Sequence, residues 1–306
     1  MSNNPAFPEH VGTVDFVVSG KTYKTWYKVI GDLKSGKIPL VTLHGGPGLN
    51  HRYMLLHKHL WTREKIPVVC YDQIGNGQSS HILDAPAEFW TPELFMDELE
   101  NLLDHLGIRD NFDLVGQSWG GMLAGHFAAA RQPSGLRRLI AANSPASIPL
   151  YVQGTNALLE KFPPEFVAKL RKHEADGTTD SKEYNELSMT FLKKHVCTLD
   201  PWPEDVMASF VMIAANPTVY HTMLGPSEFN VVGTLKDWDI IDILHRIQAP
   251  TLIVGAPNDE VQEPALLPWF LHVPKIKWVE LANSTHLGMY EEEDRYLHIV
   301  QNFLTG

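Results

Sequence analysis

Short apolar runs alternate with helical patterns along the first half of the chain. Residues 13–19 and 24–30 are rich in β-branched and aromatic residues, and a glycine-containing turn between them predicts a hairpin. Residues 38–43 and 66–72 are nearly continuous apolar runs, which are typical of strands that a parallel sheet buries on both faces. The alternation of such strands with helices predicts an α/β fold with a mostly parallel sheet.

One helix of this half has clear signals at both ends. Thr91 can cap its first turn, Pro92 stands at the first helical position, and Gly107 follows its last turn. Similar patterns continue to the end of the chain. They predict strands at 111–116, 136–144, within 249–259 and at 275–281, and helices at 50–63, 122–132, 263–272 and 291–304.

The middle of the chain has a different character. From about residue 147 to 238 the pattern is helical, proline and glycine interrupt it often, and it carries many Met and Phe residues. We therefore expect three segments. They are a first core segment 1–146, a helical cap or lid 147–238 with an apolar face, and a second core segment 239–306.

Composition and charge argue against several classes of partner. The 306 residues are 44% hydrophobic and carry a formal net charge of −11 without a run of Lys or Arg, so no nucleic-acid partner is expected. No apolar stretch reaches the roughly 18 residues of a membrane span, so no membrane partner is expected. With only two cysteines, Cys70 and Cys197, and no signal-peptide pattern in the first residues, we expect a cytoplasmic protein.

The stretch LVGQSWGGMLA, residues 114–124, follows a predicted strand and opens a predicted helix. It matches the G-x-S-x-G pattern, in which a sharp turn exposes a serine hydroxyl and the flanking glycines prevent clashes. Ser118 is therefore the candidate nucleophile. A plain glycine-rich turn is the alternative that this short pattern alone leaves open.

A serine nucleophile needs a base, and the base needs a carboxylate that orients it. Asp259 and His286 each follow a predicted strand late in the chain, so both are expected at the carboxyl edge of the sheet, where open α/β sheets bind ligands. The order Ser118, Asp259, His286 is that of an α/β-hydrolase triad. Glu260, next to Asp259, is the main competitor for the role of the acid.

The loop LHGGPG, residues 43–48, follows another buried strand. Its glycines let backbone N–H groups approach a substrate, so we expect an oxyanion hole made by the N–H groups of Gly46 and of Trp119, the residue after the serine. Gly45 is the alternative to Gly46. No metal-ligand spacing, phosphate loop or dinucleotide fingerprint is recognisable, so we expect no cofactor and no metal.

Together these stretches resemble one known family. HGGPG, YDQIGNGQSS, VGQSWGG and GPSEFNVVGTLKDWDI are similar to motifs of the proline iminopeptidase family of α/β-hydrolases, and the resemblance runs from about residue 10 to the end. It implies an α/β-hydrolase fold with helices on both faces of the sheet and an inserted helical cap. It also implies that the enzyme releases an N-terminal residue, preferably proline, from peptides through an acyl-enzyme on Ser118. Related members hydrolyse amino-acid amides, esters or lactones.

The resemblance further implies that two carboxylates hold the α-ammonium group of the substrate. Glu228, in GPSEF, matches a cap carboxylate of the family, and Glu260 matches a second carboxylate beside the acid. Two departures from the family pattern bear on this expectation. Ile74 replaces the arginine of D-Q-R-G, which removes an ion pair, and the loop GAPNDE is one residue longer than G-x-x-D-E, which would shift Glu260 away from the ammonium group.

Two other functions stay open at this point. An esterase or lactonase for a small metabolite would use the same triad, and the two departures favour it. A ligand-binding protein on a hydrolase scaffold is a third reading, and the presence of all three triad residues argues against it. The expected partner is a small molecule or a short peptide, and the sequence makes no prediction of the oligomeric state.

Overall fold

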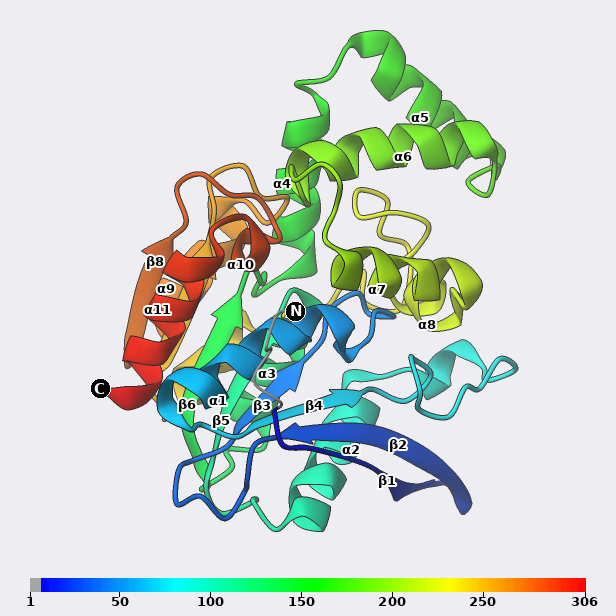
Figure 1. The fold of residues 1–306 in the computed structure, drawn as a ribbon. Coiled ribbons are helices and arrows are strands. Elements are labelled where there is room, and N and C mark those ends of the chain that lie inside the picture. The colour runs from blue at the N-terminus through cyan, green and yellow to red at the C-terminus, as the bar shows by residue number, and fades with distance from the viewer. Residues whose placement is uncertain (1–6) are drawn as a thin grey trace, which may run out of the picture.

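Eight strands form one sheet in the order β1-β2-β4-β3-β5-β6-β7-β8 in the computed structural model, which describes residues 7–306 (Figure 1). β2 pairs antiparallel with β1 and β4, and all other neighbours are parallel. The α/β fold with a mostly parallel sheet is therefore confirmed. The strands are β1 Glu9–Val18, β2 Lys21–Ile30, β3 Leu40–Leu43, β4 Val68–Asp72, β5 Phe112–Gln117, β6 Leu136–Ala142, β7 Thr251–Gly255 and β8 Ile276–Glu280.

The first hairpin is longer than the sequence predicts. Its strands have 10 residues each, and they pair as far as Val18 opposite Lys21. Between them Ser19 and Gly20 have φ angles of 51° and 79°, the positive values of the two-residue turn that fits the twist of a hairpin. Because this turn is so tight, pairing continues through polar positions that the apolar pattern alone does not include.

The central strands are buried on both faces. Every residue of β3, β4, β5 and β7 is buried, as the continuous apolar runs predict. One face packs against α2, α3 and α9, and the other packs against α1 and α11. These helices are α1 His59–Glu64, preceded by a 3-10 turn His51–Lys58, α2 Pro92–Leu106, α3 Trp119–Ala130, α9 Glu263–His272 and α11 Glu293–Thr305, with the short α10 Gly288–Glu291 before it.

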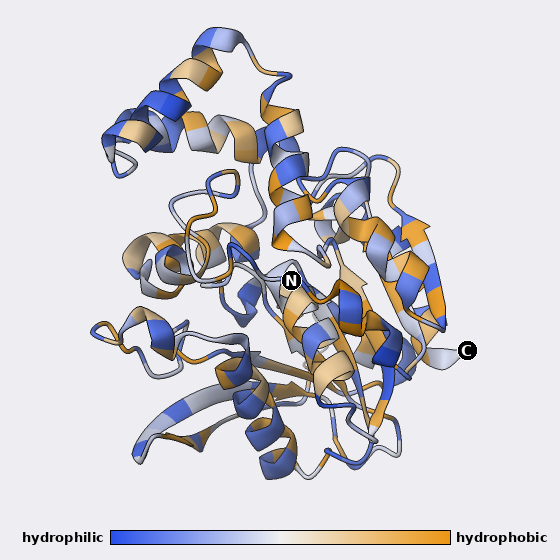
Figure 2. Cartoon of the chain, turned by 180° about the vertical axis from the view of Figure 1, so that it is seen from behind, coloured by the Kyte–Doolittle hydropathy of each residue, from blue (hydrophilic) through white to orange (hydrophobic). Residues whose placement is uncertain are grey.

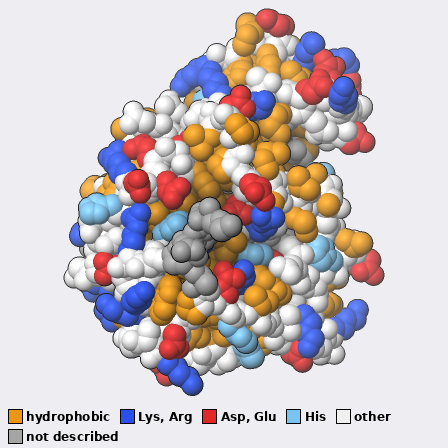
Figure 3. Space-filling view, viewed as in Figure 1, with side chains coloured by type: hydrophobic (Ala, Val, Ile, Leu, Met, Phe, Trp, Pro, Cys, Tyr) orange, Lys and Arg blue, Asp and Glu red, His pale blue; other side chains and the backbone are white. Residues whose placement is uncertain are grey.

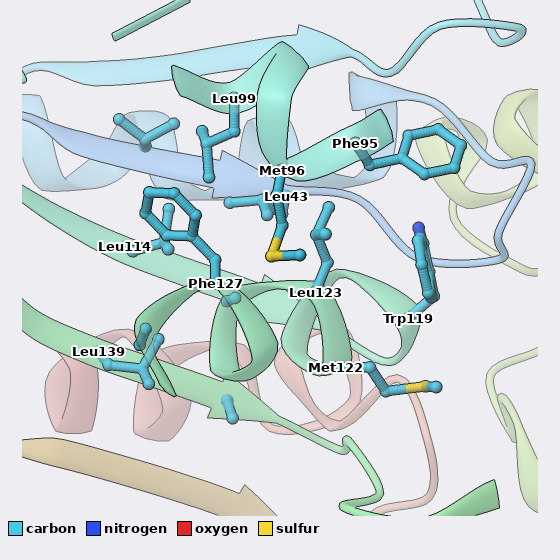
Figure 4. Packing of buried hydrophobic residues seen from close by; sticks show 14 of the residues in the cluster. Leu43, Phe95, Met96, Leu99, Leu114, Trp119, Met122, Leu123, Phe127 and Leu139 are labelled. Carbon is cyan, nitrogen blue, oxygen red and sulfur yellow. The ribbon is translucent and has the colours of Figure 1, made fainter. Parts of the chain in front are cut away.

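Helix α3 is the central support of the sheet. Figure 4 shows its side chains Leu123 and Phe127 lying between α2 and the strands, with Leu114 of β5 nearby. All three side chains are 0% or 1% exposed. This packing fixes the start of the helix, where the candidate nucleophile lies.

Five helices lie between β6 and β7 and form a cap above the carboxyl edge of the sheet (Figure 1). Two of them, α5 and α6, project as an arm in which hydrophilic and hydrophobic residues are mixed (Figure 2). The cap has an apolar cluster of its own, to which Phe229 contributes from the loop after the last helix. The limits 147–238 remain a prediction for this segment. The helices are α4 Ile148–Leu159, α5 Pro164–Asp176, α6 Lys182–His195, α7 Glu204–Ala215 and α8 Thr218–Met223.

The surface carries both signs of charge. Basic and acidic side chains are interspersed over the face drawn in Figure 3. Among the described residues, no helix is long and apolar enough to cross a membrane.

Candidate active site

Ser118 lies in a strained turn between β5 and α3. Its φ and ψ angles are 56° and −126°, outside the regions that residues other than glycine favour. Two glycines allow this turn, because a Cβ on Gly116 would lie 2.0 Å from the carbonyl oxygen of Gly120, and a Cβ on Gly120 would lie 2.1 Å from that of Leu43. A plain glycine-rich turn would not explain why the serine itself takes the strained conformation.

His286 and Asp259 lie next to each other at the carboxyl edge of the sheet. Nδ1 of His286 is 2.8 Å from Oδ1 of Asp259, and the two residues are 5% and 0% exposed. Asn143, directly after β6, donates its side-chain N–H to Oδ2 of Asp259 at 2.8 Å. The sequence reasoning missed Asn143, although a polar residue at the carboxyl end of a buried strand was a signal that could have found it.

A chain of hydrogen bonds joins the loop 43–48, the candidate oxyanion loop, to the turn of Ser118 and to His286. The N–H of Gly45 donates to Oη of Tyr53 at 2.5 Å, and Tyr53 donates to Oε1 of Gln117 at 2.9 Å. Nε2 of Gln117 then donates to the carbonyl oxygen of His286 at 3.1 Å. This network occupies the N–H of Gly45, the alternative oxyanion donor, and Tyr53 is a member that the sequence reasoning missed.

Two backbone N–H groups remain available near the serine. The N–H of Gly46 makes no hydrogen bond with another described residue. Trp119 is the first residue of α3, so its N–H has no partner within the helix. Its indole is 1% exposed, donates to Oε1 of Gln73 at 2.8 Å and packs edge-on against Phe95, which anchors the helix start (Figure 4).

His286, the candidate base, lies close to a second carboxylate. Nε2 of His286 is 3.5 Å from Oε1 of Glu260, and no hydrogen bond joins it to Oγ of Ser118 in the described part of the chain. Burial alone would lower the pKa of His286, but the charges of Asp259 and Glu260 outweigh burial and raise the pKa to about 9. The carboxylates around the imidazole therefore favour its protonated form in the unliganded site.

Glu228 and Glu260 belong to the same cluster. Tyr151 of α4 and Tyr220 of α8 donate their hydroxyl groups to the carboxylate of Glu228 at 3.0 and 2.8 Å. Burial raises the pKa of both glutamates, and the charge of Glu228 raises that of Glu260 further. The longer loop therefore does not carry Glu260 away from the site. The two tyrosines lie in the cap, where no sequence signal distinguished them.

The departure at position 74 lies in the core. The side chain of Ile74 is fully buried, and its N–H donates to both carboxylate oxygens of Glu98 at 3.0 and 2.9 Å. Glu98 is itself buried, and burial raises its pKa to about 8. Backbone and hydroxyl donors, from Ile74 and Thr25, thus satisfy this buried glutamate.

The end of the cap helix α6 is attached to the loop that carries His286. The N–H of His286 donates to the carbonyl oxygen of His195 at 3.1 Å. The carboxylate of Glu291 accepts hydrogen bonds from both the N–H and the hydroxyl of Thr198, at 2.7 and 2.6 Å, and from the N–H of Thr285 at 2.6 Å. Glu291 thus ties the segment after α6 to the residue before the base.

Glu291→Ala is expected to weaken this attachment. The variant leaves several donors without an acceptor, so the free energy of unfolding should fall by about 2 kcal/mol, and kcat should fall with it. Urea unfolding and steady-state kinetics measure the two effects, with Glu293→Ala, at an exposed position nearby, as the control. Equal free energies of unfolding and equal kcat values for the two variants would contradict the role given to Glu291.

Comparison with known proteins agrees with this geometry. A family model described as the alpha/beta hydrolase fold matches residues 38–293. The chain is 33% identical over 285 residues to a proline iminopeptidase of Flavobacterium johnsoniae, with 92% of this chain and 94% of that protein covered. The chain belongs to the proline iminopeptidase family of α/β-hydrolases. The family that the motifs predict is confirmed, and with it the class of enzyme, a serine hydrolase.

Two solved structures share this fold closely. The crystal structure of a proline iminopeptidase from Mycobacterium smegmatis has a TM-score of 0.86 and 38% identity, and the match covers 96% of this chain and 97% of that one. The crystal structure of VinJ has a TM-score of 0.91 and 45% identity, and the match covers 96% and 98%. In this family member no group of three His, Cys, Asp or Glu side chains within residues 7–306 is placed to hold a metal ion.

Proposed function

We propose that this protein is a serine aminopeptidase that releases an N-terminal residue, preferably proline, from short peptides, or hydrolyses small amino-acid amides. The observation that carries the proposal is the carboxylate pair Glu228 and Glu260 beside the base His286. A plain esterase has no need of two buried carboxylates at that place, whereas a substrate with a free amine does. Relatives named proline iminopeptidase support the same reaction.

The proposed reaction begins at Ser118. Its Oγ attacks the carbonyl carbon of the N-terminal residue while its proton passes to Nε2 of His286, which Asp259 orients through Nδ1. The negative charge that develops on the carbonyl oxygen is stabilised by the N–H groups of Gly46 and Trp119. His286 then protonates the leaving amine, and water hydrolyses the acyl-enzyme by the same steps in reverse.

The proposed role of the carboxylate pair is to bind the substrate's α-ammonium group. A buried cation loses its hydration, and two carboxylates within reach offset that loss through charge-assisted hydrogen bonds. Tyr151 and Tyr220 hold Glu228 in place for this contact. An acylated or deaminated substrate would leave the pair unneutralised, so the site would select a free N-terminus.

A panel of substrates tests this proposal. We expect hydrolysis of prolyl p-nitroanilide and, more slowly, of other aminoacyl p-nitroanilides, with little hydrolysis of N-acetylprolyl p-nitroanilide because its nitrogen carries no charge. Hydrolysis of simple p-nitrophenyl esters or acylated lactones in the absence of any aminoacyl hydrolysis would favour the esterase or lactonase reading. A folded sample that neither cleaves the panel nor reacts with a fluorophosphonate would favour a ligand-binding protein.

A further inference from the structure

We propose that Glu260 restrains His286 in the free enzyme, and that the ammonium group of the substrate releases it, so that the amine both binds the site and activates the base. The inference rests on the proposed aminopeptidase function and adds a regulatory role for Glu260. It concerns the rate at which Ser118 reacts, in addition to the affinity for substrate.

The arrangement around Nε2 of His286 is the first observation. This nitrogen must accept the proton of Ser118, yet it lies 3.5 Å from Oε1 of Glu260 and makes no hydrogen bond with Oγ of Ser118 within residues 7–306. Glu260 is 2% exposed. The carboxylate of Glu260 is therefore shielded from solvent, and His286 is the cationic side chain that lies beside it.

The other oxygen of Glu260 is the second observation. Oε2 is buried and has no hydrogen-bond partner among the described residues. A buried carboxylate oxygen without a donor is costly, and a donor supplied by a ligand would remove that cost. Glu228 lies near enough to raise the pKa of Glu260 by its charge, so a cation that enters here meets both carboxylates.

The charge balance of the free site gives the third observation. The acid that orients the base is already present, so Glu260 and Glu228 add negative charge beyond what a triad requires. The charged groups that act on His286 are Asp259 and Glu260, from the loop after β7, and Glu228, from the loop after α8. Tyr151 of α4 faces the two glutamates, and the ring of His195 is hydrogen-bonded to the carbonyl oxygen of Asn258.

This surplus keeps the base protonated. Nε2 of His286 lies 3.5 Å from Oε1 of Glu260, and the charges of Asp259, Glu260 and Glu228 together raise the pKa of His286 above its ordinary value, which favours the protonated ring. An ammonium group that pairs with Glu260 and Glu228 brings one positive charge into the cluster. His286 then gives up one proton to the solvent, so that the net charge of the site is unchanged and Nε2 is free to accept the proton of Ser118.

The consequence is that an amine accelerates the chemistry of Ser118 even when the amine is a separate molecule. Pyrrolidinium, the cation of the proline ring without its carbonyl group, provides the charge and offers no bond to cleave. A neutral alkyl fluorophosphonate reports the reactivity of Ser118. The Oγ–P bond forms, the P–F bond breaks, fluoride leaves with the bonding electrons, and the Oγ proton passes to His286.

The experiment measures the rate of fluorophosphonate labelling at pH 7 and constant ionic strength. We expect added pyrrolidinium to accelerate labelling of the wild-type enzyme several-fold, while potassium at the same concentration does not. We expect Glu260→Gln to label at least about tenfold faster than wild type without any amine, since each unit by which the pKa of the base falls gives about tenfold more neutral base. The pH profile of labelling should move to lower pH in this variant.

Glu263→Gln is the matched control, because it removes the same charge from an exposed position three residues away. Labelling that pyrrolidinium leaves unchanged or slows, together with equal rates for Glu260→Gln and Glu263→Gln, would overturn the proposal. The wild-type arm needs no variant, so poor folding of Glu260→Gln leaves the test intact. Hydrolysis of prolyl p-nitroanilide by the same samples separates the restraint of His286 from the proposed aminopeptidase function. If labelling overturns the restraint but hydrolysis persists, only the restraint is wrong. If hydrolysis is also absent, the proposed function is wrong as well.

Discussion

Ser118→Ala is expected to abolish hydrolysis of every substrate and to leave the fold unchanged. Without Oγ no acyl-enzyme can form, and kcat should fall by at least about 10⁴-fold, as when a serine nucleophile is removed from a triad. The hydroxyl makes no hydrogen bond within the described residues, and alanine can occupy the same strained backbone, so the melting temperature should change little. Steady-state kinetics on prolyl p-nitroanilide and a thermal unfolding curve measure both effects.

Ser134→Ala serves as its control, since Ser134 is an exposed serine in the same half of the core. This variant should retain wild-type activity. If Ser118→Ala kept more than a small fraction of the wild-type rate, the nucleophile would have to be another group, and the strained turn at β5 and α3 would have a structural role alone.

Glu228→Gln is expected to remove the preference for a free amine. Glutamine keeps the shape and can still accept a hydrogen bond from Tyr151 or Tyr220, but it loses the charge that pairs with the ammonium group. Loss of one partner of a buried charge pair costs about 2–4 kcal/mol, so kcat/KM for prolyl p-nitroanilide should fall by roughly 30- to 1,000-fold. Fluorophosphonate labelling, which involves no ammonium group, should not fall in parallel.

The same substitution at Glu165, on an exposed position of α5, is the control for a change of cap charge. A uniform loss, in which amine substrates and fluorophosphonate are affected alike, would mean that Glu228 is a structural residue of the cap. In that case the amine site would have to lie elsewhere.

The core of this molecule could be predicted because its pattern is strong. Buried parallel strands leave continuous apolar runs. Gly116 and Gly120 are required around Ser118 because a Cβ on either would lie about 2 Å from neighbouring backbone. Asp259 and His286 follow from the same logic, since each stands in the loop after a strand of the parallel sheet.

The positions of the cap tyrosines and of Glu260 could not be predicted from the sequence in the same way. Tyr151 and Tyr220 reach Glu228 from two cap helices, and nothing along the chain shows that these helices face one another. The loop of Glu260 gave the opposite expectation, because its extra residue suggested a displacement, whereas the structure keeps the carboxylate 3.5 Å from His286.

The most direct test of the account compares two substrates that differ at one atom. Prolyl p-nitroanilide carries the ring ammonium, and cyclopentanecarbonyl p-nitroanilide has carbon in its place with nearly the same shape and the same leaving group. If the triad of Ser118, Asp259 and His286 works together with an amine site, kcat/KM for the prolyl compound should be higher by at least about 100-fold, the value of one good buried charge pair. Equal values of kcat/KM for the two compounds would contradict the account.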